Sequence, residues 1–300
     1  MEQIGDSAGE AVTTKVVGGI GNQLFCYFAG YYLAKKLGYE LKVDVSDIRS
    51  KRSVHDVSIE ALELPGTFFE TPSSPVQILL NRVRNKVHRT LPKLRISRSS
   101  FTSKEIGFDP LLDKVTTPVS IQGYFQSYKY FTSFSNEVKV IKLKDPTPWY
   151  LQMEKTLSDK KFTSVHVRRG DYVNYSQTYG LLSVKYYEEA IRNLSQQNLL
   201  NQLYIFSDDI DAARDMLSHS VPEDTIWIDP PSESNPVESL MLMSLASSNI
   251  IANSTYSWWG ATLNKEKTAV IAPKKWFRSM LDPEFLYPPE WQLMESSWED

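Results

Sequence analysis

Two adjacent arginines stand in the segment Ser164-Val-His166-Val-Arg168-Arg169-Gly170-Asp171-Tyr172, at the end of a predicted strand. Successive side chains of a strand point to opposite faces, so one arginine can face a ligand while the other braces the site. A guanidinium keeps its charge at any working pH, and its planar fork suits bidentate contact with phosphate. Asp171 can orient either guanidinium. The segment predicts a phosphate site, and the alternative is a structural Arg–Asp ion pair at a strand end.

The glycine-rich segment Gly18-Gly19-Ile20-Gly21-Asn22-Gln23 follows one predicted strand and precedes a predicted helix. Loops of this kind cradle phosphates with their backbone N–H groups. The segment is not a dinucleotide fingerprint, because Leu24 occupies the third glycine position, and no P-loop Gly-Lys-Ser/Thr follows. The alternative is a glycine turn without a ligand.

A polar run, Asn253-Ser254-Thr255-Tyr256-Ser257-Trp258-Trp259-Gly260, also joins a predicted strand to a predicted helix. Its hydroxyls and the N–H groups of a helix start suit a diphosphate, because a helix N-terminus favours anions. The alternative is an ordinary helix cap. For Trp258 and Trp259 we favour the core over a sugar platform.

An acidic segment, Ser207-Asp208-Asp209-Ile210-Asp211, ends another predicted strand and contains the D-x-D pattern of metal-dependent transferases. So short a pattern arises by chance, and Asp209 or Asp211 is equally suited to cap the next helix. A carboxylate here can instead accept hydrogen bonds from the N–H groups of a guanine base. We predict no metal site, because the single Cys and four widely spaced His lack zinc-ligand spacing.

Composition excludes several protein classes. A hydrophobic share of 41% and a charged share of 23% indicate a globular protein rather than a disordered one. A net charge of −3 argues against a nucleic-acid binder. The single cysteine, Cys26, excludes an intramolecular disulfide, and no run of about 20 apolar residues predicts a membrane span. Residues 1–10 lack the order of a secretory signal, so we expect a cytoplasmic protein.

Alternating strand and helix patterns are predicted to position these segments. The chain opens with a strand over 14–17, a helix that ends at Gly38, and a strand over 41–45. Further strands are predicted over 162–167, 203–207, 225–228, 249–252 and 269–272, and helices over 184–197 (capped by Ser183), 211–217, 236–246 and 257–263. Repeated units of this kind predict an α/β fold with a mostly parallel sheet, which binds ligands at the carboxyl ends of its strands. Pro146 and Pro148 mark a domain boundary.

Several ordered segments resemble the bacterial α-1,2-fucosyltransferases of glycosyltransferase family 11. They are GGIGNQLF, GYFQSYKYF, HVRRGDYV, YIFSDDI, and NIIANSTYSWWGA followed by VIAPKKW. The matches run from about residue 15 to about residue 276. Cys26-Tyr27 stands where the family usually has Gln-Tyr, and residues 50–115 show no clear correspondence.

The resemblance implies a GT-B-like fold of two Rossmann-like, doubly wound lobes. It also implies GDP-β-L-fucose as donor, inversion at the anomeric carbon and no metal cofactor. We expect a loose tail over 1–12, an acceptor-side lobe over 13–150 and a GDP-fucose-binding lobe over 151–300. The implied acceptor is the 2-hydroxyl of a galactose-terminated glycan in O-antigen or lipopolysaccharide synthesis. A fucosyltransferase of different linkage and a non-catalytic binding protein on the same scaffold are the alternatives.

The same resemblance makes Arg168 the donor-phosphate contact, with His166 and Asp171 beside it in the catalytic group. It assigns guanine to an aspartate of the acidic segment, Asp208 or Asp209. The predicted donor site comprises Gly19, Gly21, Asn22, Gln23, His166, Arg168, Arg169, Ser207, Asp208, Asp209, Asn253, Ser254, Thr255 and Ser257. The base for the acceptor hydroxyl stays open, since a positioning role suits His166 and Asp171 equally well.

Residues 76–98 combine a basic face with apolar residues at helical spacing, and no acidic residue lies between Glu70 and Glu105. One interpretation is a solvated helix face. The other is peripheral docking on an anionic membrane, where lipid-linked acceptors would sit.

Overall fold

The structure is a computed structural model that describes residues 11–50, 53, 55–71, 100–138, 140–264 and 267–299. The chain forms two compact units. The first comprises residues up to Glu60, Leu64–Ser133 and Glu284–Leu286, and the second comprises Ala61–Glu63, Phe134–Pro283 and Tyr287–Asp300. The whole of the basic region over 76–98 lies outside the described residues.

The first unit is built on a parallel sheet in the order β3-β2-β1-β5-β4. Its strands are β1 (Ala11–Lys15), β2 (Glu40–Asp44), β3 (Thr67–Phe69), β4 (Ser100–Thr102) and β5 (Ser120–Gln122). Helix α1 (Ile20–Leu37) packs so closely on β1 that a Cβ at Gly30 would lie 2.5 Å from Thr14 Cβ. The helix ends at Gly38, whose φ of 74° confirms the predicted stop.

Short helices complete this unit and lead into the second. They are α2 (Ser46–Arg49), η1 (Ser58–Ala61), η2 (Leu112–Lys114), η3 (Tyr128–Tyr130), η4 (Thr132–Phe134) and α4 (Ser135–Val138). Among the described residues, no helix is both long and apolar enough to span a membrane.

The second unit is built on a parallel sheet in the order β11-β10-β9-β6-β7-β8. Its strands are β6 (Phe162–Val167), β7 (Gln202–Ser207), β8 (Ile226–Trp227), β9 (Ser248–Ile250), β10 (Ala269–Pro273) and β11 (Gln292–Met294). Counted from β6 as the first strand, the spatial order is 3-2-1-4-5-6, the arrangement of a Rossmann fold. The order reverses between β6 and β9.

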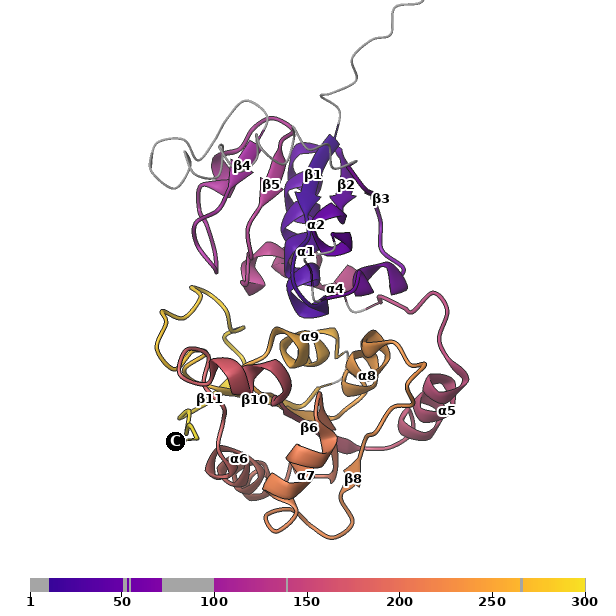
Figure 1. Ribbon diagram of the computed structural model, residues 1–300, viewed down its shortest axis with the longest axis vertical. Helices are drawn as coiled ribbons and strands as arrows, with labels where there is room; N and C mark the ends of the chain where they lie inside the picture. Colours follow the sequence, from indigo (N-terminus) through magenta and orange to yellow (C-terminus); the bar gives the residue numbers. More distant parts are fainter. Residues whose placement is uncertain are drawn as a thin grey trace, which may run out of the picture. The chain divides into compact units, whose positions relative to one another are not determined.

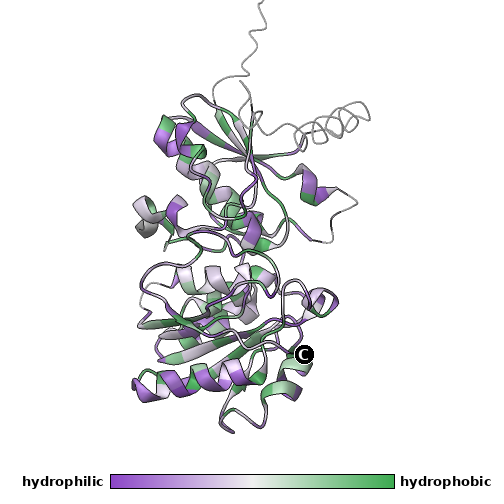
Figure 2. Ribbon diagram, turned by 90° about the vertical axis from the view of Figure 1, so that its left-hand side faces the viewer, coloured by the Kyte–Doolittle hydropathy of each residue, from purple (hydrophilic) through white to green (hydrophobic). Residues whose placement is uncertain are grey.

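Helices cover both faces of this sheet. They are α5 (Pro148–Leu157), α6 (Val184–Gln196), α7 (Ile210–Leu217), α8 (Pro236–Met243) and α9 (Thr255–Leu263), and η5 (Gly170–Tyr175) follows β6. Figure 1 shows α8 and α9 on one side of the strands and α6 and α7 on the other. The helices carry both hydrophilic and hydrophobic residues (Figure 2), as expected where one face packs on a sheet and the other meets water. All six residues of β6 are buried, as in a central parallel strand.

The two parallel α/β units confirm the predicted fold class, GT-B-like with two Rossmann-like lobes. The units divide after Ser133, earlier than the boundary expected at residues 150/151. The physical reason is that the chain before α5 is fixed to the second unit. Thr147 donates from its backbone N and from Oγ1 to the buried Glu238 carboxylate of α8, at 2.7 and 2.9 Å.

Two local expectations also differ from the structure. The first strand spans Ala11–Lys15 rather than 14–17, so residues 11 and 12 belong to the sheet and not to a tail. Ser183 stands at the N-cap of α6 but makes no side-chain capping bond, and its hydroxyl donates to Ser297 Oγ at 2.9 Å.

Candidate functional site

The arginine segment and the polar run meet at the point where the strand order of the second sheet reverses. Open α/β sheets bind ligands in the crevice outside the carboxyl ends of the two strands that flank this point. Here those strands are β6, which leads into Arg168, and β9, which leads into Asn253. The Tyr172 hydroxyl joins the two segments by donating to Asn253 O at 3.2 Å. Burial raises the pKa of Tyr172 to about 12, which keeps this donor protonated.

Arg168 is the charged residue at this reversal of strand order. Its guanidinium pairs with Asp171 and, at 2.9 Å, with Asp208 Oδ2, and its Cζ lies 4.9 Å from the centroid of the Tyr172 ring. Nε of Arg168 is buried and has no hydrogen-bond partner in the described part of the chain. Asp171 is about half exposed, at 52% for its side chain, so it can yield its place to an anion. The arginine is therefore held in place while some of its donors remain free.

Asp208 organises the loop that carries Arg168. The register of the parallel strands pairs Val167 with Ser207, which brings the residues after them together. Besides pairing with Arg168, Asp208 accepts from Arg169 N at 2.9 Å. A Cβ at Gly170 would lie 2.1 Å from Asp208 Oδ2, and the φ of Gly170 is +25°, so the loop requires glycine for this approach.

Two residues of the acidic segment were predicted to contact guanine, and Asp209 is a better candidate than Asp208. Both carboxylate oxygens of Asp208 are engaged by the arginine loop. Asp209 caps α7 through Oδ1, which accepts from Ala212 N at 3.0 Å, and its Oδ2 makes no hydrogen bond within the described ranges. Ser207 Oγ donates to Asp209 O at 2.9 Å and accepts from Asp209 N at 3.0 Å, which makes it part of the turn. No group of three or more His, Cys, Asp or Glu in the described ranges is arranged to hold a metal, and the metal-independent chemistry stays a prediction.

His166 lies beneath the arginine, buried at 2% exposure, with its ring 5.4 Å from that of Tyr256. Burial, and secondly the charge of Arg168, lowers the pKa of His166 to about 3. A neutral imidazole with so low a pKa is a weak base at neutral pH. The structure therefore favours a positioning role for His166.

The depressed pKa predicts acid sensitivity of folding. In the unfolded chain a histidine binds its proton near pH 6.5, whereas His166 in the fold binds it only near pH 3. The unfolded state thus binds more protons between these values, so stability falls as pH is lowered from about 6.5. At pH 5 the loss due to this residue is expected to be about 2 kcal/mol.

Denaturant unfolding of wild type and His166→Phe between pH 7.5 and 5 tests this. The variant is expected to lose stability less steeply than wild type as pH falls. His219→Gln, at an exposed histidine, serves as control and should follow wild type. If the unfolding free energies of wild type and His166→Phe fell equally with pH, the lowered pKa of His166 would be contradicted.

The polar run forms the start of α9. Ser254 is the N-cap, and its hydroxyl accepts from Tyr256 N at 3.3 Å. Ser257 is buried and donates within the helix, to Ser254 O at 3.2 Å. Of the three predicted hydroxyl contacts, Thr255 at the first helical position is the most exposed, and it stands where helix N–H groups favour an anion. Trp258 and Trp259 are fully buried, which confirms their place in the core.

Asn253 has a structural role rather than a ligand-binding one. Its side chain is 1% exposed, and its Nδ2 donates to Tyr179 O, Gly180 O and Trp276 O at 3.0, 3.2 and 3.2 Å. One amide therefore ties three segments behind the crevice. The N–H groups of this side chain are engaged by backbone carbonyls, which disfavours Asn253 as a donor contact.

The glycine-rich segment belongs to the first unit. Gly19 is the N-cap of α1, while Gly21, Asn22 and Gln23 lie in the first helical turn rather than in a loop. Gln23 is fully buried: its Nε2 donates to Gly18 O and Asp56 O, both at 2.8 Å, and its Oε1 accepts from Ile59 N at 3.0 Å. This side chain shapes the turn and has no donor left for a ligand.

Asn22 and Gln126 meet where the strand order of the first sheet reverses, between β1 and β5. Gln126 Nε2 donates to Asn22 Oδ1 at 2.9 Å, and its buried Oε1 is without a partner in the described ranges. Sequence reasoning left Gln126 out of the site, although it stands in the GYFQS segment. A cavity of about 190 Å³ lies close by in this unit, lined among the described residues by Val17, Gly18, Asp47, Ile48, Ser50 and Ser53. Its polar groups are engaged within the protein: Asp47 pairs with Lys15 at 3.0 Å, and Ser50 Oγ donates to Asp47 O at 2.7 Å.

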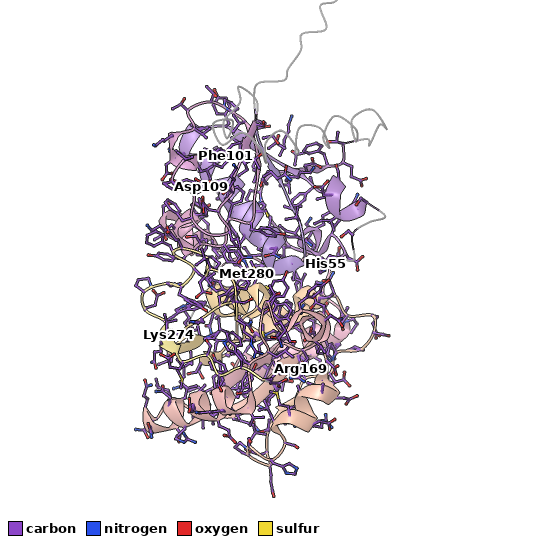
Figure 3. All side chains as sticks on the ribbon, turned by 60° about the vertical axis from the view of Figure 1, so that its left-hand side comes forward. His55, Phe101, Asp109, Arg169, Lys274 and Met280 are labelled. Atoms are coloured by element: carbon purple, nitrogen blue, oxygen red, sulfur yellow. The ribbon has the colours of Figure 1, made fainter. Side chains whose placement is uncertain are left out.

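Arg169 is turned away from its neighbour. Its guanidinium pairs with Glu299 and its Nη1 lies 3.7 Å from Met216 Sδ (Figure 3 labels Arg169). Arg169 thus has a carboxylate partner of its own, and the facing of Arg168 toward a ligand stays a prediction. Glu299 had no sequence signal, because it lies 130 residues away along the chain.

The resulting arrangement places one permanently charged guanidinium and one helix N-terminus at the same strand-order reversal. Both stabilise negative charge through fixed donors, the property required where a diphosphate leaves.

Comparisons with known proteins identify one matching family and several similar proteins. The model of glycosyl transferase family 11 matches residues 11–295. An α-1,2-colitosyltransferase of Escherichia coli is 30% identical over 297 residues, which cover 95% of this chain and 99% of that protein. The O-antigen biosynthesis glycosyltransferase WbnK of Escherichia coli is 28% identical and covers 87% of this chain and 93% of its own. The fucosyltransferase NodZ from Bradyrhizobium is similar in structure with a TM-score of 0.47 and 14% identity, over 87% of this chain and 95% of that one.

The family match extends from the first described strand to the residues just after β11, so it includes nearly all of both units. The protein belongs to glycosyl transferase family 11.

Proposed function

We propose that the protein transfers L-fucose from GDP-β-L-fucose to the 2-hydroxyl of a terminal β-galactoside, with inversion and without a metal. The observation that carries the proposal is Arg168, held between Asp171 and Asp208 at the strand-order reversal, beside the start of α9. The names of its relatives, an α-1,2-colitosyltransferase and an O-antigen glycosyltransferase, support an α-1,2 linkage and a role in O-antigen synthesis.

The proposed reaction begins as GDP leaves C1 of the fucosyl group. Negative charge then builds on the β-phosphate, and fixed donors must neutralise it. Arg168 supplies a charged fork, and the N–H groups at Thr255 supply the helix N-terminus. Asp209, through the carboxylate oxygen that does not cap α7, is the candidate contact for guanine. The acceptor hydroxyl attacks the opposite face of C1, and its base is not assigned.

Colitosyl transfer is the second candidate, because one relative of 30% identity is an α-1,2-colitosyltransferase. Colitose is L-fucose without its 3-hydroxyl, so the two donors differ by a single polar group. A site that hydrogen-bonds this hydroxyl discriminates strongly against the deoxy sugar, whereas an apolar site does not.

A donor and acceptor panel tests the proposal. GDP-fucose, GDP-colitose and GDP-mannose are each incubated with β-galactosides, with and without chelator, and the product linkage is determined by NMR. We expect an α-1,2-fucosyl product that forms equally well with chelator. Preference for GDP-colitose would establish the second candidate, and GDP binding without transfer would establish a non-catalytic binding protein.

Cytoplasmic action, where nucleotide sugars are available, is part of the same proposal. Peripheral docking through residues 76–98 is a separate prediction, and co-sedimentation with anionic liposomes tests it. Absence of binding at low salt would remove the idea.

A further inference from the structure

The last described residues of the chain, 297–299, lie against residues 180–183 and are called here the C-terminal strap. Ser183 N donates to Ser297 O and Glu299 N donates to Leu181 O, both at 2.8 Å. The Trp298 ring occupies the space beside Gly180: a Cβ there would lie 2.4 Å from the ring, and the φ of Gly180 is +83°. Backbone bonds and ring packing thus fix the strap to the second unit.

The strap ends at a carboxylate that holds Arg169. Glu299 pairs with the Arg169 guanidinium, and both side chains are largely covered, at 29% and 19% exposure. The backbone of Glu299 is itself fixed, because Arg278 Nη1 donates to Glu299 O at 2.7 Å. A charge-assisted bond between two partly buried and anchored groups is geometrically specific. The Arg169 side chain is therefore held by a different carboxylate from the two that hold the Arg168 side chain.

The backbone between the two arginines is unusual and depends on its surroundings. Arg169 has φ −126° and ψ −90°, outside the regular regions, and Gly170 follows with φ +25°. Such conformations persist only where neighbouring groups over-determine them. Two carboxylates do so here: Asp208 accepts from Arg169 N at 2.9 Å, and Glu299 holds the Arg169 side chain. Arg168 is the adjacent residue. A change in the backbone angles of Arg169 would therefore redirect the guanidinium of Arg168.

We infer that Glu299 is a positioning residue for donor binding, which acts through Arg169 to aim Arg168 at the β-phosphate of a nucleoside diphosphate. The inference rests on the proposed function. Glu299 lies beyond residue 295, where the family match ends, so the match does not account for it.

Glu299→Gln tests the inference, because it keeps the shape of the side chain and removes its charge. The matched control is Glu295→Gln, since Glu295 pairs with Lys274 in the same part of the chain and both side chains are mostly exposed, at 77% and 59%. GDP and GMP affinities are measured by calorimetry, with the thermal midpoint of each variant and kcat/KM for the donor. GMP lacks the β-phosphate, so it reports on the rest of the site.

We expect Glu299→Gln to weaken GDP binding about tenfold and to lower kcat/KM at least as much, with GMP binding and the midpoint unchanged. Glu295→Gln should match wild type in every measurement. Equal GDP binding by wild type and Glu299→Gln would overturn the inference, and so would an equal loss of GDP and GMP binding, which indicates a structural role. Wild-type protein that binds neither nucleotide would instead overturn the proposed function, and with it this inference.

Discussion

Arg168→Ala is expected to lower kcat/KM for fucosyl transfer by about a hundredfold or more, equivalent to a barrier about 3 kcal/mol higher. The substitution removes the charged donor from the place where negative charge develops. It also leaves Asp171 and Asp208 without their partner, so two carboxylates then face the incoming diphosphate. Both effects act against the donor, and GDP affinity should fall together with turnover.

Arg168→Lys should restore little of this activity. An ammonium is a point charge, and it cannot contact two carboxylates and a phosphate with the geometry of a guanidinium fork. Arg192→Ala, at an exposed position on α6, is the matched control and is expected to keep wild-type rates. Initial rates over a range of donor concentrations separate the effects on kcat and KM. Near-wild-type turnover of Arg168→Ala would show that the charge on the leaving group is neutralised elsewhere.

Asn253→Ala is expected to cost about 2–3 kcal/mol of unfolding free energy, because the carbonyls of Tyr179, Gly180 and Trp276 lose a buried donor. For a lobe of this size the thermal midpoint should fall by about 5–10 °C. Asn253→Asp should destabilise at least as much near neutral pH, because a carboxylate would face three carbonyl oxygens.

Calorimetric and denaturant unfolding measure these changes. Asn193→Ala is the control, since this asparagine of α6 bonds to the exposed Gln197 and its loss should change stability by less than about 0.5 kcal/mol. If Asn253→Ala instead kept wild-type stability and lost GDP affinity, the side chain would belong to the donor site after all.

Local signals in the sequence were sufficient for several elements of both units. The buried strand over 162–167 has the bounds of β6, and the cap at Gly38 lies where a left-handed residue is needed. These features follow from short-range rules of apolar spacing and of the residues that tolerate special backbone angles. The strand over 14–17 is displaced from its observed bounds by three residues at its start, because pairing with β2 rather than local pattern decides where β1 begins.

The residues predicted to bind the donor fall into two groups, those with polar atoms free for a ligand and those bonded within the protein. Only their neighbours in the fold explain the difference. Three polar residues are of the kind that bind phosphate: Ser257, Asn253 and Gln23. Each is buried, and its side chain donates hydrogen bonds to other groups of the protein. Residue type alone does not distinguish these roles, because a buried amide or hydroxyl must be satisfied by whichever group packs against it. Gln126 is the converse case, a residue whose unpaired oxygen became visible only in the fold.

The sequence by itself determined that HVRRGD and its companion segments stand at strand ends, that the fold is α/β and that the chain resembles family 11. Tertiary structure decided which strand ends are neighbours, since the order β9-β6-β7 depends on pairings between residues far apart in the chain. It also decided which arginine is which: Arg168 faces Asp171 and Asp208, while Arg169 pairs with Glu299. The spacing of apolar residues and the propensity of each residue for helix or strand act over a few residues. The orientation of a side chain is instead set by partners that sheet order and packing bring together.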